Sequence, residues 1–168
     1  MTISMYQASA PRFANMLRNL SALIDKAEAH CAAKKIDPTA LTTFRLYPDM
    51  FPFTRQVQIA CDTAKGAVAR LAGAEIPKHD DTEQTFAELK SRIAKTIDFI
   101  ESVKAERVDG SEEKEVVLPM RSGERRFKGM QYLLGFAYPN FYFHITTAYN
   151  MLRHNGVEIG KQDFIGKP

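Results

Sequence analysis

One imidazole and one carboxamide stand among aromatic residues in the segment Pro139-Asn140-Phe141-Tyr142-Phe143-His144. In a helix with about 100° per residue, Asn140 and His144 fall on one stripe. The same stripe carries apolar residues that we expect to face the core: Leu133, Ala137, Ala148 and Met151. A polar pair on a core face must be hydrogen-bonded, must bind a ligand or metal, or must line a cavity, because an unpaired buried polar group is costly. This pair is therefore the first candidate site.

Further polar candidates lie on a second helical segment, around residues 52–72. Gln56 falls near the core stripe of that segment, whereas Gln58 points toward its polar face, so we expect Gln56 to be the glutamine that reaches the imidazole. Asp62 lies one turn beyond Gln58 and has two interpretations. It is a general base or metal ligand, or it is a structural carboxylate that is either solvated or paired with Lys65 three residues later.

Two cysteines occur, Cys31 and Cys61, and their spacing is that of neither a zinc site nor a disulfide exchange motif. We interpret both as reduced, buried thiols, with a nucleophilic Cys61 as the alternative. The other histidines fall at helix ends or in loops, and we expect them at the surface: His30, His79 and His154.

Apolar residues that recur at intervals of three and four predict four long helices, at about residues 9–34, 52–72, 81–104 and 129–156. Gly73 suits the end of the second helix, and Asp81 with Gln84 resembles a capping box at the start of the third. In the fourth helix, Pro139 removes one backbone hydrogen bond, so we expect a kink just before Asn140.

A short β-hairpin is predicted between the third and fourth helices. Residues 115–119 and 125–128 read as its two strands, and residues 121–124, which include a glycine, read as the turn.

The remaining segments are connections. Residues 34–51 contain two Pro-Asp or Asp-Pro pairs and predict a long connection with one short helical turn. The tail from residue 157 to residue 168 is too short for a domain, but Phe164 and Ile165 could anchor it. We therefore predict an all-α fold, a four-helix bundle with a short β-hairpin before the fourth helix, in a single domain spanning residues 1–168.

The fourth helix also carries a second apolar stripe, formed by Tyr138, Tyr142, Ile145 and Tyr149. A bundle helix normally needs one such face. Either the hairpin and tail cover this second stripe, or a second subunit does, so we expect a homodimer.

Composition excludes several classes of protein. The 168 residues are 45% hydrophobic and 26% charged, which is typical of an ordered globular domain. The formal net charge is only +3, and the basic residues are spread along the chain, so nucleic acid is not an expected partner. No stretch approaches the ~18 apolar residues of a membrane span, and the N-terminus lacks a secretory pattern, so we expect a cytoplasmic protein without a membrane partner.

Two stretches, PNFYFHITTAYNMLRHNG and RQVQIACDTAKGAVARLAG, resemble the DinB/YfiT-like superfamily, and within it a bacterial family classed as a domain of unknown function. The resemblance covers nearly the whole chain and implies a DinB-like bundle. Characterised members of the superfamily are metal-dependent, and some transfer low-molecular-weight thiols. They share a three-histidine site with one histidine on the second helix and two, four residues apart, on the fourth.

This chain departs from that pattern. His144 matches the second histidine of the fourth-helix pair, Asn140 stands in place of the first, and Gln56 or Gln58 stands in place of the second-helix histidine. Carboxamides are poorer donors to zinc or nickel than imidazole, thiolate or carboxylate. Amide and imidazole groups can instead form a neutral hydrogen-bond network.

Three hypotheses remain open at this stage. The first is a DinB-like protein without a cofactor that binds a small polar molecule in an interhelical cavity, with His144, Asn140, Gln56 and Gln58 as ligand-binding residues and a degenerate metal site. The second is a divergent metal-dependent transferase, similar to the thiol transferases, in which His144 holds zinc or nickel with Gln56, Asn140 and Asp62. The third is a structural dimerisation module. Whether the protein is an enzyme is left open.

Overall fold

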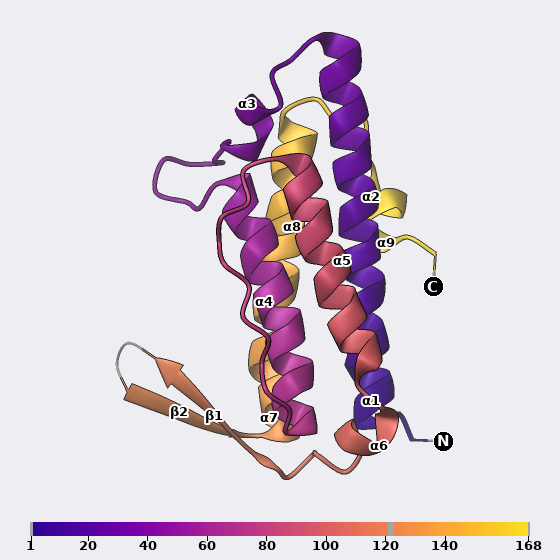
Figure 1. Cartoon of the computed structure of the whole chain (residues 1–168), viewed down its shortest axis with the longest axis vertical. Coiled ribbons are helices and arrows are strands. Elements are labelled where there is room, and N and C mark those ends of the chain that lie inside the picture. The colour runs from indigo at the N-terminus through magenta and orange to yellow at the C-terminus, as the bar shows by residue number, and fades with distance from the viewer. Residues whose placement is uncertain (1, 121–122, 168) are drawn as a thin grey trace.

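The computed structural model describes residues 2–120 and 123–167. Long helices run side by side along most of its length (Figure 1). They are α2 (Ala10–Lys34), α4 (Phe53–Ala72), α5 (Phe86–Ser102) and a continuous helical run made of α7 (Gly129–Tyr132), η1 (Leu133–Ala137) and α8 (Tyr138–His154). Helix α4 packs against both α8 and α5, and α5 packs against α2. The fold is thus mostly helical with one hairpin, although it contains more helices than the four predicted.

Within the described ranges, four short helices accompany the long ones: α1 (Met5–Ala8), α3 (Thr39–Thr42), α6 (Ala105–Val108) and α9 (Lys161–Ile165). Helix α3 is the helical turn expected in the long connection. The predicted limits of α2 and α4 agree with the structure to within one residue. Helix α4 ends where Gly73 adopts a left-handed conformation (φ 63°), which a glycine reaches without steric cost.

The predicted start of α5 is wrong. The helix begins at Phe86, and its capping box is formed by Thr85 and Glu88 instead of Asp81 and Gln84. Thr85 Oγ1 accepts a hydrogen bond from the Glu88 amide (3.2 Å), and Glu88 Oε2 accepts one from the Thr85 amide (2.9 Å). The Asp81 carboxylate cannot cap the helix because it pairs with Arg55 and Arg92.

The fourth helical run is interrupted earlier than expected. A π-helical segment occupies Leu133–Ala137, and Pro139 lies in the first turn of α8. A π-helical turn has wider hydrogen-bonded rings, so it can absorb the backbone bond that a proline cannot make. The kink was predicted just before Asn140, whereas the irregular segment begins at Leu133 and ends at Ala137, directly before Tyr138 and Pro139.

The hairpin pairs β1 (Glu115–Met120) with β2 (Gly123–Lys128) in antiparallel register, with Val117 opposite Arg126. It projects from one end of the bundle (Figure 1). Gly123 and Glu124, predicted in the turn, belong to β2, and the other two predicted turn residues, 121–122, lie outside the described residues. The chain enters α7 at Gly129, where a Cβ atom would lie 1.9 Å from the Ser111 carbonyl oxygen, so only glycine fits.

The second apolar stripe of α8 is covered largely within the chain. Tyr138 packs edge-on against Phe13 of α2 (5.4 Å between ring centroids), and Tyr149 packs against Phe164 of α9 (5.7 Å). Ile145 is fully buried, whereas Tyr142 is partly exposed. Helix α2 and the tail thus supply the aromatic contacts to this stripe.

In the described part of the chain, no helix combines the length and the apolar character that crossing a bilayer requires.

Candidate functional site

His144 lies in the interface between α8 and α4 and is 7% exposed. Its Nδ1 atom is 2.6 Å from Oε1 of Gln56, which is 1% exposed. Gln56 Nε2 in turn donates to the Phe51 carbonyl oxygen (3.1 Å). Because that bond sets the amide orientation, Oε1 is the acceptor and Nδ1 of the imidazole carries the proton. The structure thus brings together two of the predicted site residues in a neutral, hydrogen-bonded pair.

The environment of His144 favours its uncharged form. Desolvation by burial lowers the pKa of the imidazole from its ordinary 6.5 to about 4, and the nearby Arg55 guanidinium acts in the same direction. His144 is therefore neutral at physiological pH and is a poor proton donor there.

Asn140 does not join this pair. It is half-buried, and its Nδ2 atom donates to Thr63 Oγ1 on α4 (2.9 Å). Asn140 and Thr63 both line a cleft of about 230 Å³ whose lining includes neither His144 nor Gln56. The sequence predicted a cavity around both Asn140 and His144. The cleft in the structure is lined by Asn140 but not by His144.

This cleft, which we call the Asn140 cleft, has one polar and one apolar wall. The full lining consists of Asp62, Thr63, Arg70, Leu118, Pro119, Met120, Tyr132, Phe136 and Asn140. Arg70 Nη1 donates to the Tyr132 hydroxyl (3.2 Å), and its guanidinium lies 5.9 Å from the centre of the same ring. Burial raises the pKa of Tyr132, so the hydroxyl keeps its proton. Arg70 makes no ion pair with any residue in the described ranges.

Gln58 belongs to a different group of side chains. It is 4% exposed, accepts from Arg55 Nη1 (3.2 Å) and donates to Glu83 Oε2 (2.9 Å). The four predicted ligand-binding residues are therefore divided among three places: the His144–Gln56 pair, the cleft beside Asn140, and a charged network that includes Gln58.

That charged network is centred on Arg92, a residue that the sequence reasoning missed. The side chain of Arg92 is 1% exposed, and its guanidinium pairs with Asp62 (2.8 Å), Asp81 (3.0 Å) and Glu83 (3.0 Å). Burial disfavours the charged form, but the carboxylates of Asp62 and Glu83 outweigh it and raise the pKa of Arg92. The sequence did contain one indication that Arg92 is buried, because it falls on the buried stripe of α5 between Leu89 and Ile93.

Asp62 is accordingly an ion-pair residue. Its Oδ1 atom accepts from Arg92 Nη2 and from Lys65 Nζ (2.8 Å each), and the second contact is the predicted pairing three residues along the helix. Both cationic side chains are almost completely buried. Asp62 therefore compensates two buried charges, a structural role that competes with general-base chemistry.

The two thiols are unreactive by environment. Burial raises the pKa of Cys61 to about 12, and burial also raises the pKa of Cys31. Both remain protonated at neutral pH, in agreement with the interpretation as buried structural thiols.

The donors present do not fit the three-histidine centre that the resemblance implies. Across residues 2–120 and 123–167, no three His, Cys, Asp or Glu side chains lie close enough together to hold a metal ion. The expected centre is represented by the imidazole of His144 and the carboxamide of Gln56, which bond to each other. The carboxamide of Asn140 bonds to Thr63 instead. Carboxamide oxygens suit hard cations better than zinc or nickel, so this donor set does not favour a transition metal.

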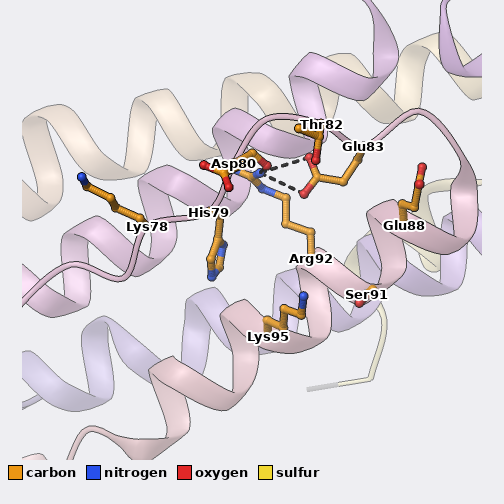
Figure 2. Close-up of a pocket in the computed structure, with 9 residues that line it drawn as sticks. All are labelled: Lys78, His79, Asp80, Thr82, Glu83, Glu88, Ser91, Arg92 and Lys95. Atoms are coloured by element: carbon orange, nitrogen blue, oxygen red, sulfur yellow. Dashed lines mark hydrogen bonds and ion pairs between the residues drawn. The ribbon is translucent and has the colours of Figure 1, made fainter.

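A second cavity, of about 430 Å³, lies between α5 and the connection that precedes it (Figure 2). It is lined by His79 and Arg92, among others. His79 is half-buried instead of exposed as predicted, and desolvation together with Lys65 and Arg92 lowers its pKa.

Comparisons with known proteins place this architecture among previously described ones. A family model described as "Domain of unknown function (DUF1993)" matches residues 5–165. A crystal structure of a DinB family member from Shewanella denitrificans is 45% identical in sequence, with a TM-score of 0.92; the match covers 97% of this chain and 92% of that chain. A comparison with curated proteins gives no match.

Proposed function

Because this chain belongs to the DUF1993 family of DinB-like proteins, we propose that it binds a small polar molecule in the Asn140 cleft and does so without a metal. The observation that carries the proposal is the convergence on this cleft of polar groups that bond in pairs across it, Arg70 with Tyr132 and Asn140 with Thr63. Arg70 offers a guanidinium without a carboxylate partner in the described chain, and Tyr132 offers a protonated hydroxyl.

The chemistry of the walls indicates the class of ligand. A guanidinium recognises a carboxylate or similar anion, and an amide, a hydroxyl and a phenol supply further hydrogen bonds. The apolar wall formed by the hairpin and η1 can hold a short hydrocarbon part. A volume of about 230 Å³ lies below the ~300–1,000 Å³ of typical ligand pockets, which favours a molecule the size of a small organic acid.

The position of the cleft agrees with this interpretation. It borders Asn140, which replaces a histidine of the superfamily pattern, and the neighbouring His144 is held neutral by Gln56. A ligand in the cleft would thus occupy the flank of the former metal position. The His144–Gln56 pair would serve as a rigid, uncharged support.

The test is a titration of the purified chain with a panel of small carboxylic and amino acids, followed by amide chemical shifts in NMR. We expect one chemical class to give saturable shifts in α4 around Thr63 and in the hairpin. The variants Asn140→Ala and Arg70→Gln should weaken this binding by about tenfold, the equivalent of one lost charge-assisted hydrogen bond. The matched control is Arg12→Gln, which removes an exposed arginine far from the cleft in the sequence, on α2. Binding that is unchanged in Asn140→Ala and Arg70→Gln would contradict the proposal.

Metal analysis of the same protein, purified without a metal-affinity tag, tests the hypothesis of a metal-dependent transferase. Stoichiometric zinc or nickel that is lost in His144→Ala would favour a metal-dependent transferase over a metal-free binding protein.

The expected homodimer is tested separately by light scattering coupled to size-exclusion chromatography. The exposed part of the second stripe, chiefly Tyr142, is the surface that a partner copy would cover. A monomer at concentrations well above the micromolar range would exclude the dimerisation module.

A further inference from the structure

Helix α4 contains a buried glycine in its interior, Gly66, which lies between Thr63 and Arg70, two residues that line the Asn140 cleft. A glycine inside a helix is destabilising relative to alanine, because it loses more conformational freedom on folding. Gly66 does not use the left-handed conformation that favours glycine, since its φ is not positive. The reason for a glycine at this position must therefore lie in what occupies the space beside it.

That space is filled by the guanidinium of Arg70, one turn further along α4. Apart from the adjoining residues and the backbone of the same helix, the three atoms nearest to a Cβ built at Gly66 all belong to Arg70: Nη1 at 2.5 Å, Cζ at 3.6 Å and Nη2 at 3.9 Å. Non-bonded heavy atoms prefer separations of about 3.5–4.0 Å. Any side chain at position 66 would therefore displace the guanidinium, and it would meet no other side chain as closely.

Glycine thus allows Arg70 to fold back along α4, with one edge of its guanidinium free. Its Nη1 atom donates to the Tyr132 hydroxyl (3.2 Å). In the described part of the chain, Nε and Nη2 have no hydrogen-bond partner, and neither belongs to the fully buried atoms that lack one, so both are accessible. Nε and Nη2 form the edge of a guanidinium that can hold a carboxylate by two parallel hydrogen bonds.

The end of the helix does not explain this position of Arg70. Basic side chains near a helix C-terminus often bond its last carbonyl groups. In α4 other residues do so, because Arg107 donates to the Ala72 carbonyl (3.2 Å) and Lys114 to the Leu71 carbonyl (3.1 Å). The Arg70 guanidinium is thus left for the cleft that it lines.

We propose that Gly66 is a positioning residue of the Asn140 cleft: by leaving room for the Arg70 guanidinium, it holds the free Nε–Nη2 edge in place for the carboxylate of the ligand. The role of Gly66 in binding rests on the proposed function, and it specifies that the ligand is recognised through a carboxylate held by two parallel hydrogen bonds. A methyl group at position 66 would move the guanidinium away from Tyr132. The rest of the packing would remain, because the displaced group is the end of a flexible side chain.

The variant Gly66→Ala tests the placement of Arg70 without any ligand. In NMR, the side-chain Nε–H signal of Arg70 and the ring signals of Tyr132 report the contact between them. We expect both to shift in Gly66→Ala, and the Tyr132 ring signals to shift in the same direction in Arg70→Gln. The melting temperature should not fall, because alanine favours the helix. Unchanged signals, or a lower melting temperature, would overturn the proposal.

Binding is tested with propionate, and sodium chloride at matched ionic strength corrects for screening. Gly66→Ala should weaken binding about tenfold, as Arg70→Gln does. The double variant should bind no more weakly than Arg70→Gln alone, because both changes act through one guanidinium. The matched control Gly135→Ala adds the same methyl group to a helical glycine where it meets no atom within 4 Å, and it should bind like the unmodified chain.

The outcomes separate the role of Gly66 from the proposed function. No saturable binding of propionate by the unmodified chain would contradict the proposed function and, with it, the role of Gly66 in binding. Weaker binding in Arg70→Gln but not in Gly66→Ala would overturn the role of Gly66 alone. Additive losses in the double variant would do the same, since Gly66 would then act by another route.

Discussion

Helix α4 buries polar groups at two interfaces, and it does so in opposite ways. Toward α8, it presents Gln56 to a neutral His144, whose pKa is lowered to about 4 because burial disfavours the charge. Toward α5, it presents Asp62 to Arg92, whose charge is retained because several carboxylates surround it. A buried group that titrates near neutrality gives up its charge, whereas a guanidinium must be paired.

The two interfaces differ in what they leave unsatisfied. In the α8 interface, the imidazole proton and both polar atoms of the Gln56 amide have partners. In the α5 interface, the buried Nε of Arg92 has no hydrogen-bond partner among the described residues. His144, the residue that the sequence singled out first, thus lies at the interface with α8, where it is hydrogen-bonded. The interface with α5 is centred on Arg92, which the sequence reasoning missed.

The largest expected effect comes from the charged interface. Arg92→Met keeps most of the side-chain volume but leaves Glu83 and its neighbours without their shared cation, and it should lower the free energy of unfolding by about 3 kcal/mol. Urea unfolding followed by circular dichroism measures the change. In the control Arg126→Met, which removes an arginine from exposed ion pairs on the hairpin, the unfolding midpoint should not move. A loss in Arg92→Met as small as that of the control would mean that the network contributes nothing to stability.

The neutral interface should appear in the pH dependence of stability. The folded chain resists protonation of His144 down to about pH 4, whereas the unfolded chain binds that proton near pH 6.5. Stability linked to His144 is therefore complete above pH 6.5 and decreases as the pH falls from 6.5 to 4, by at most about 3 kcal/mol at 1.36 kcal/mol per pKa unit. Carboxylates and His79 also contribute to acid sensitivity, so the quantity to compare is the difference between the unmodified chain and His144→Gln. If both lose stability in parallel over this range, His144 does not carry the effect.

Removing the partner of the imidazole should have a smaller effect. Gln56→Ala leaves His144 Nδ1–H and the Phe51 carbonyl without their amide, and we expect a loss of about 1–3 kcal/mol in the free energy of unfolding. The matched control Asn150→Ala removes an exposed amide from α8 and should be nearly neutral. Double-mutant analysis with His144→Ala gives the coupling, and additive losses would contradict a direct interaction.

The smallest effect concerns the start of α5, which frames the charged interface. Thr85→Ala removes the side-chain cap and should cost about 1 kcal/mol, whereas Gln84→Ala should leave stability unchanged. Thermal unfolding of the two variants decides between the two capping boxes. A larger effect of Gln84→Ala would support the start predicted at Asp81.

Local patterns were sufficient to predict much of the fold. The apolar repeats of α2 and α4, the glycine at position 73 and the alternating hairpin strands specify elements through short-range rules, and these appear where expected. The start of α5 was mistaken because two similar capping sequences lie four residues apart. The choice between them depends on Arg92 and Arg55, which engage Asp81 from elsewhere in the fold.

The candidate site was only partly predictable, for a related reason. The helical stripe indicates that His144 faces inward, and the position of Gln56 indicates the side of α4 from which it could be reached. Helical periodicity describes one helix at a time, however, so it cannot show that Asn140 turns to Thr63 or that Gln58 joins Glu83.

The amino-acid sequence by itself determined the helical class, the hairpin and the inward direction of one histidine, because these follow from the spacing of apolar residues and from turn chemistry. Only the tertiary structure decided which polar groups meet and where space remains between them. It pairs Asp62 with the buried Arg92 and places the His144 imidazole in hydrogen-bonding contact with Gln56. It also leaves a cavity beside Arg92. Those outcomes depend on how neighbouring helices pack against α4, and that relation is not encoded in any single segment.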